Sequence, residues 1–205
     1  MTHRHLGVAL AALGLLAAPS GAAAADITFA AVGGPPSIAK ASTFVGILGS
    51  LTDQHTASMV VVAPEDLRGI LVSGRAQVTF DVDPTVEDFA AFEAAGLVDL
   101  GPNQMGALPE RHTMVTRDLI EVAPEVVEFL NLFFVSGSRL DEMAALVEDD
   151  AIADDKMSAW LTANEPWIRN MLALCPEFSS GVCESGEGAR PFKAKDWYGT
   201  PEADR

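Results

Sequence analysis

The chain has 205 residues and a formal net charge of −16 at pH 7. Because this surplus of acidic residues repels phosphate backbones and anionic lipid, we expect no nucleic-acid partner. A cationic or zwitterionic solute would be favoured near such a surface, although salt screens exposed charges beyond about 10 Å. A second interpretation is that the acidity only keeps an exported protein in solution.

Residues 1–25 have the pattern of a secretory signal peptide. A basic start at Arg4 is followed by an apolar stretch at residues 6–18, and then by a Pro, Ser and Gly break before a run of alanines. The apolar stretch is shorter than the roughly 20 residues that a transmembrane helix needs. Cleavage after Ala24 or Ala25 would release a periplasmic protein.

The segment that follows alternates between short β-rich runs and runs of helix length. This alternation is typical of α/β domains with a mainly parallel sheet flanked by helices. Proline at a first helical position, acids in a first turn and glycine just after a last turn mark the helix boundaries. The predicted strands are residues 27–32, 57–62, 77–81 and 97–100, and the predicted helices are residues 36–50, 64–73 and 85–95.

The second half of the chain is predicted to be mostly helical. Residues 101–110 contain Gly, Pro, Asn and Gln and indicate a crossing loop, after which residues 112–116 could return to the sheet as a strand. Apolar stripes at helical spacing then predict four helices. They cover residues 124–134, 140–147, 156–162 and 167–174.

The end of the chain loses this periodicity. We therefore expect one α/β domain at residues 26–174 and an irregular tail at residues 175–205. In an exported chain, Cys175 and Cys183 predict a disulfide that closes a small loop. A metal site there would need further ligands, and the segment contains no histidine.

The loops at the carboxyl ends of the strands are where an open α/β sheet binds ligands. Glycines there allow close approach of a ligand, hydroxyls offer hydrogen bonds, and two carboxylates could face a cation. Another interpretation is that Ser37, Asp83 and Thr85 only cap helices. The candidate ligand-binding residues are Gly33, Gly34, Ser37, Asp81, Asp83 and Thr85.

Catalytic motifs are absent from the sequence. It contains no G-x-S-x-G, no H-E-x-x-H and no P-loop. His55 and His112 are placed near the expected starts of strands, away from the candidate loops. We therefore predict no catalytic residues, no metal and no cofactor, and a protein that is not an enzyme.

Three segments resemble the glycine betaine, proline betaine and choline binding proteins of ABC transporters. They are ITFAAVGG at residues 27–34, GILVSGRAQVTFDVDPTVEDF at residues 69–89, and residues 114–172, which contain APEVVEFL and the ending AWLTANEPWIRNML. Members of this family carry a second α/β lobe between the first and last of these segments. The resemblance therefore implies a single lobe of a periplasmic solute-binding protein.

The resemblance implies transport of a quaternary-ammonium or related osmoprotectant to a membrane permease. In that family aromatic rings surround the ammonium group, whose charge attracts the ring faces. This sequence has Gly34 and residues 82–84 where two of these rings are expected. Trp160, Trp167 and Trp197 lie in the C-terminal helices and tail, where we expect packing rather than ligand contact.

Two functions therefore remain open. The first is a periplasmic binding protein for a small zwitterionic or cationic solute, in which a homodimer or a partner protein supplies the second wall of the site. The second is an exported accessory or scaffold protein that keeps the lobe but has lost solute binding.

Overall fold

The computed structural model describes residues 24–51, 54–84, 89–105 and 111–172. Nearly all of the predicted signal peptide lies outside these ranges, as do the predicted tail, Thr85 and the predicted Cys175–Cys183 disulfide. None of the helices within the described ranges is long and apolar enough to cross a bilayer.

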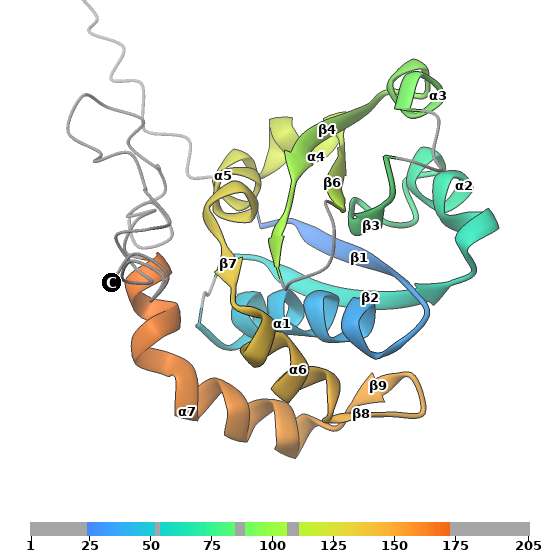
Figure 1. Cartoon of the computed structure of the whole chain (residues 1–205). Helices are drawn as coiled ribbons and strands as arrows, with labels where there is room; N and C mark the ends of the chain where they lie inside the picture. Colours follow the sequence, from blue (N-terminus) through green and yellow to red (C-terminus); the bar gives the residue numbers. More distant parts are fainter. Residues whose placement is uncertain (1–23, 52–53, 85–88, 106–110, 173–205) are drawn as a thin grey trace, which may run out of the picture.

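The centre of the structure is a five-stranded sheet with the order β2-β1-β3-β6-β4 (Figure 1). Strands β2, β1 and β3 are parallel, whereas β6 lies between β3 and β4 and runs antiparallel to both. Four of the five strands therefore share one direction, which confirms the predicted mainly parallel sheet. The strands are β1 (Asp26–Val32), β2 (Thr56–Val62), β3 (Val78–Val82), β4 (Leu97–Pro102) and β6 (His112–Thr116).

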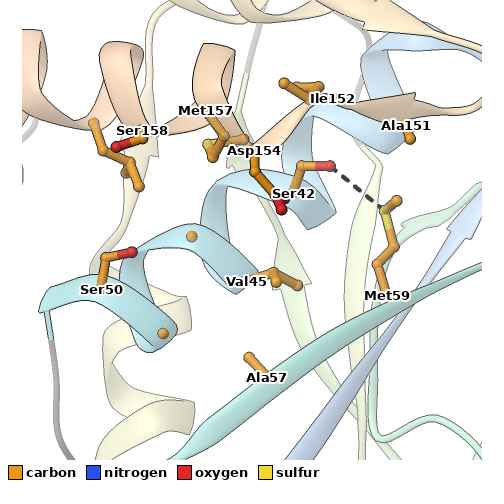
Figure 2. Close-up of a pocket in the computed structure, with 13 residues that line it drawn as sticks. Ser42, Val45, Ser50, Ala57, Met59, Ala151, Ile152, Asp154, Met157 and Ser158 are labelled. Atoms are coloured by element: carbon orange, nitrogen blue, oxygen red, sulfur yellow. Dashed lines mark hydrogen bonds between the residues drawn. The ribbon is translucent and has the colours of Figure 1, made fainter.

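Helices cover both faces of the sheet. Helix α1 (Pro35–Leu51) packs on one face, where Ser42 Oγ donates a hydrogen bond to Met59 Sδ of β2 at 3.6 Å (Figure 2). On the other face a separate apolar cluster joins the sheet to α2 (Leu67–Val72) and α3 (Phe89–Ala94). The segment predicted as one helix at residues 64–73 begins with a short 3-10 turn, Pro64–Asp66.

Most of the C-terminal elements pack over α1, and together they complete the main core (Figure 1). Strand β7 pairs with the short strand β5, and β8 and β9 form a hairpin. These elements are β5 (Gln104–Met105), α4 (Arg117–Val122), α5 (Pro124–Leu132), β7 (Phe134–Val135), α6 (Gly137–Ala144), β8 (Val147–Glu148), β9 (Ala151–Ile152) and α7 (Asp154–Leu172).

Several predictions for this half of the chain were wrong. The helix predicted at residues 140–147 runs instead from Gly137 to Ala144. Residues 101–105 were predicted as part of a crossing loop, but they contain the end of β4, which continues to Pro102, and all of β5. The two predicted helices at residues 156–162 and 167–174 form one helix, α7, that contains Pro166. A proline removes one helical hydrogen bond, but the buried side chains of Trp160 and Ile168 on either side of it hold both segments against the core.

Aromatic packing around Phe44 joins the sheet to the C-terminal helices. The Phe44 ring centroid lies 4.9 Å from that of Phe80 in the sheet and 4.6 Å from that of Phe133 after α5. Phe29 of β1 and Phe129 of α5 lie at 5.8 Å and 5.7 Å from the same ring. Since all five side chains are buried, the two halves of the chain share one core.

A buried polar pair lies near the amino ends of strands β1 and β2. His55 Nε2 lies 2.6 Å from Glu125 Oε1, and both side chains are almost fully buried. His55 Nδ1 accepts a hydrogen bond from the Ala25 backbone N–H at 3.2 Å, so the proton that bridges to Glu125 is carried on Nε2 when the ring is neutral. This pair joins the start of the described chain to α5.

We expect Phe44→Ala to lower the free energy of unfolding by about 3–5 kcal/mol, because it removes a buried ring that touches four others. Urea unfolding followed by far-UV circular dichroism would measure the change. Val72→Ala is the control, since Val72 is 50% exposed and surface changes of this kind stay within about 0.5 kcal/mol. Equal effects of the two substitutions would contradict the assigned role of Phe44.

Candidate functional site

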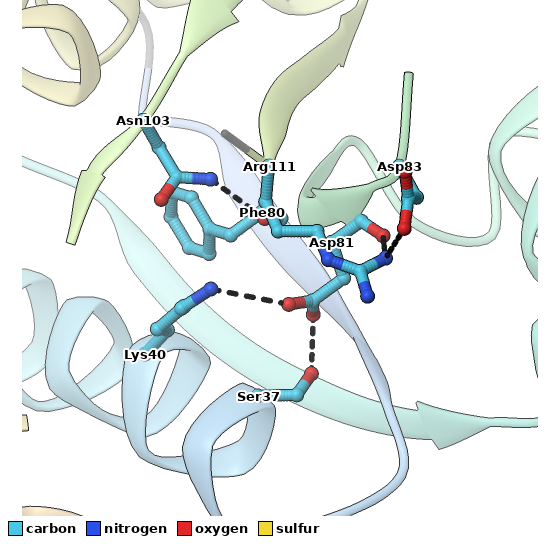
Figure 3. A network of polar contacts seen from close by, with 7 residues as sticks. All are labelled: Ser37, Lys40, Phe80, Asp81, Asp83, Asn103 and Arg111. Atoms are coloured by element: carbon cyan, nitrogen blue, oxygen red, sulfur yellow. Dashed lines mark hydrogen bonds and ion pairs between the residues drawn. The ribbon is translucent and has the colours of Figure 1, made fainter. Parts of the chain in front are cut away.

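The candidate site lies where the carboxyl ends of β1 and β3 meet the start of α1 (Figure 3). A cavity of about 220 Å³ opens there. Carboxyl ends of parallel strands and helix N-termini expose free backbone groups, so this is the edge at which α/β sheets bind ligands. The cavity is lined by Val32, Gly33, Pro36, Ser37, Lys40, Asp81 and Arg111.

The turn from β1 into α1 orients the first side chains of the site. Gly34 has a φ of 107°, a conformation that glycine adopts without strain, and the next two residues are Pro35 and Pro36 at the start of the helix. Ser37 and Lys40 then follow three residues apart, so they lie on the same face of α1. This face is turned toward the end of β3 (Figure 3).

Asp81 of β3 is held by both of these α1 side chains. Its Oδ2 accepts a hydrogen bond from Ser37 Oγ, and its Oδ1 lies 3.4 Å from Lys40 Nζ. The Lys40 and Asp81 side chains are only 2% and 11% exposed, which makes this a buried ion pair. The negative charge of Asp81 is thus balanced by a cation of the protein itself.

Lys40 nevertheless keeps the capacity to bind a ligand. An ammonium group has three N–H donors. Within the part of the chain that the structure describes, Lys40 Nζ makes one hydrogen bond, and its length of 3.4 Å is greater than usual. An acceptor that entered the cavity would find donors on Lys40.

Arg111 closes the other side of the cavity. It directly precedes β6, and its Nη1 donates to the backbone oxygen of Asp81 and contacts Asp83 Oδ2, both at 3.3 Å. The Arg111 side chain is 39% exposed and also lines the cavity, so it is accessible from solvent. Nearby, Asn103 Nδ2 donates to the Phe80 backbone oxygen at 2.7 Å and fixes the loop before β5.

The structure brings most of the predicted site residues together. Gly33, Ser37 and Asp81 line the cavity, Gly34 forms the adjacent turn, and Asp83 reaches it through Arg111. Thr85 lies outside the described residues. The two carboxylates that were expected to face a cation, Asp81 and Asp83, are each paired with a basic side chain of the chain itself.

The sequence did not point to Lys40 or Arg111. Lys40 is the only charged residue of α1, whose other side chains are small or apolar: PPSIAKASTFVGILGSL. A lone lysine in such a run was the signal that could have identified it. Arg111 lies next to the predicted crossing loop. Only the antiparallel return of β6 places it beside the end of β3.

The position predicted for His112 was also wrong. Because β6 is antiparallel to β3, the first residue of β6 pairs with Val82 at the carboxyl end of β3. His112 therefore lies at the end of the sheet that carries the candidate site. There its Nδ1 is 2.9 Å from Asp99 Oδ2 and its ring packs on Phe89. His55, in contrast, lies before β2 at the opposite edge, as expected.

Two types of site are not formed by the described residues. No group of three or more His, Cys, Asp and Glu side chains among them could hold a metal ion. None of the residues that line the cavity is aromatic. Trp160 is buried and Trp167 packs against the core, with the Arg139 guanidinium 4.3 Å above its ring, so both serve packing as predicted.

Comparisons with solved structures identify the fold. A glycine betaine, L-proline ABC transporter binding protein, ProX from Borrelia burgdorferi, matches 70% of this chain and 95% of its own with a TM-score of 0.56 and 9% identity. Lactococcal OpuAC, in a closed form with glycine betaine, matches 71% of this chain and 98% of its own with a TM-score of 0.54 and 8% identity. No protein-family model and no curated protein sequence matches the chain.

At these low identities the similarity is one of fold. The chain has the mixed α/β architecture of a periplasmic-binding-protein lobe, as the sequence predicted. The solved structures that it resembles are solute-binding proteins, and the roles of individual residues must come from the geometry of this chain.

We expect Asp81→Ala to lower the free energy of unfolding by about 3–5 kcal/mol, because it leaves the buried Lys40 ammonium without its carboxylate. Replacing both charges, as Lys40→Met with Asp81→Leu, should recover most of that loss. Chemical denaturation would compare the free energy of unfolding of both variants with that of the control Asp141→Ala, since Asp141 is an exposed acid of α6. If Asp81→Ala proved as stable as the Asp141→Ala control, the ion pair would have no structural role.

Proposed function

We propose that this chain is the periplasmic solute-binding component of an ABC transporter and that it holds a small zwitterionic osmolyte of the glycine betaine type. The cavity between Lys40 and Arg111 is the observation that carries this proposal. The fold similarity to two solute-binding proteins supports it, since one belongs to a glycine betaine and L-proline transporter and the other was solved in complex with glycine betaine.

The basic side chains favour a ligand with a carboxylate. Lys40 has donors to spare, and the exposed part of Arg111 presents a planar guanidinium that matches a carboxylate in a two-point contact. Behind them, the 17-residue helix α1 directs its N-terminus at the cavity, where the Ser37 N–H follows two prolines that have none. A cation without a carboxylate, such as choline, would find both acidic groups already paired.

The size of the cavity indicates that this lobe forms only half of the site. Complete small-molecule sites enclose about 300–1,000 Å³ and bury most of the ligand, whereas this cavity measures about 220 Å³. We propose that a second copy of the chain or a partner protein supplies a second wall that would cover the ligand. That wall would also have to supply any aromatic contact to the ammonium group.

A second candidate is an exported scaffold protein that has lost solute binding. The observation that favours it is the internal pairing of charges: Asp81 with Lys40, and Asp83 with Arg111. A site whose charges are already balanced holds its shape without a ligand.

Thermal unfolding in the presence of glycine betaine, proline betaine, carnitine, proline and choline would separate the two candidates. A solute at 100 times its dissociation constant should add about 2.7 kcal/mol to the free energy of unfolding. We expect the carboxylate-bearing solutes to raise the melting temperature and choline to have a smaller effect. If none of them raises it, the scaffold function is favoured.

Arg111→Ala should weaken binding of the carboxylate-bearing solutes by about 10- to 100-fold, because it removes a charged hydrogen bond worth about 1.5–3 kcal/mol. Isothermal titration calorimetry would measure the dissociation constants. Arg68→Ala is the matched control, since Arg68 is an exposed arginine of α2 outside the cavity lining. Equal losses in both variants would indicate a general charge effect and argue against a carboxylate contact at Arg111.

A further inference from the structure

A second and larger cavity lies along the free edge of β2 (Figure 2). It measures about 410 Å³ and shares no residue with the solute cavity. Residues of α1 form its floor, β2 forms one wall, and β9 with the start of α7 forms the other. We call this cavity the β2 groove.

The backbone of β2 has unpaired groups at this edge. The Thr56 N–H donates to the Ala25 oxygen on the β1 side at 3.0 Å. Since alternate residues of a strand point their N–H and C=O groups to opposite sides, those of Ala57, Met59 and Val61 point away from β1. No backbone group of another described residue pairs with them.

The two edges of the sheet differ in a way that supports a pairing role for β2. Natural edge strands are usually protected by charges, prolines or bulges. Edge strand β4 has all three, in Asp99, Pro102 and a register shift between them. Strand β2, TASMVVV, has none, and it pairs with β1 in register over seven residues. An unprotected edge beside a groove is suited to strand addition.

The surroundings of the groove indicate the chemistry of an added strand. Its inner surface is apolar and includes Val45, Met59 and Leu161. Its outer rim, formed by β9 and the start of α7, includes the exposed Asp154. Three further exposed acids, Asp149, Asp150 and Asp155, flank these rim residues in the chain. Apolar side chains would therefore face inward and basic side chains would face the rim.

We propose that the β2 groove binds an extended, basic segment of a partner protein, which adds a sixth strand at the free edge of β2. Its backbone would bond to the outward N–H and C=O groups of Met59 and Val61, while alternate apolar side chains would enter the groove. This inference is independent of solute binding at the Lys40–Arg111 cavity.

A second copy of the chain fits the groove less well. Antiparallel pairing of two β2 strands would bring two acidic rims to one junction, and like charges across an interface are unfavourable. The net charge of −16 adds to this repulsion. A dimer formed at the solute cavity would leave the β2 groove open.

A fluorescent peptide of nine alternating Val and Lys residues is the probe, and fluorescence anisotropy with the purified protein measures its binding. We expect saturable binding, with the outward amide protons of Met59 and Val61 becoming protected from exchange with solvent. The same peptide methylated at alternate backbone nitrogens should bind at least tenfold more weakly, because it cannot form the ladder. Equal binding of the methylated peptide would indicate a charge effect only and overturn the proposal.

Gly49→Leu tests the groove itself. Gly49 lines the groove, and a Cβ added there would meet no atom within 4 Å, so the side chain of a leucine has open space at its base and would occupy part of the groove. We expect at least a tenfold loss of peptide affinity and no loss of stability, because leucine is also the better helix former. Gly69→Leu is the matched control, since Gly69 lies in α2 with equally open space around it.

The outcomes separate the possible occupants. A tenfold loss for Gly49→Leu with no change for Gly69→Leu supports the proposal. No binding of the probe, or an equal effect of the two substitutions, overturns it. A dimer in light scattering that Gly49→Leu dissociates would also overturn it, because the occupant would then be a second copy. Both variants should bind solutes as the unsubstituted protein does. The solute titrations therefore test the proposed function separately from the groove.

Discussion

The rest of the structure depends on the antiparallel insertion of β6 between β3 and β4. This strand pairs Val115 with Val78 on one side and with Val98 on the other, so residues from both halves of the chain complete one sheet. Because β6 runs against its neighbours, its first residues lie at the carboxyl ends of the parallel strands. That geometry places Arg111 beside Asp81 and Asp83, and it sends the chain on toward the helices that cover α1.

Helix α1 connects the core with both proposed binding sites. Its first turns direct Ser37 and Lys40 to the solute cavity, its centre places Phe44 among four other phenylalanine rings, and its last turns form the floor of the β2 groove. Burying Lys40 is favourable only with a partner, and Asp81 provides one at the end of β3. The same pairing that stabilises the lobe thereby holds the Lys40 ammonium group at the cavity. An acidic group of a ligand can accept hydrogen bonds from its remaining N–H donors there.

The sequence predicted well those elements whose pattern is local. Strand β6 has the predicted bounds, β1 and β2 differ from the prediction by one residue at one end, and α1 differs by one residue at each end, because alternating apolar residues and Pro or Gly boundaries specify them. The prediction failed where distant contacts decide. The sequence predicted separate helices on either side of Pro166, but burial of Trp160 and Ile168 keeps α7 continuous. The two-residue strands β5 and β7 have no pattern of their own.

Of the candidate site, the sequence by itself determined the place and the first residues. A strand that ends in glycines followed by a proline helix start must present Gly33 and Ser37 at the carboxyl edge of a parallel sheet. Only the tertiary structure decided the charge balance there, because the direction of β6 brings Arg111 to this edge and the rotation of α1 turns Lys40 to Asp81. The Lys40–Asp81 pair joins residues 41 positions apart. Such long-range pairs depend on how strands and helices pack, and spacing along the sequence carries no information about that packing.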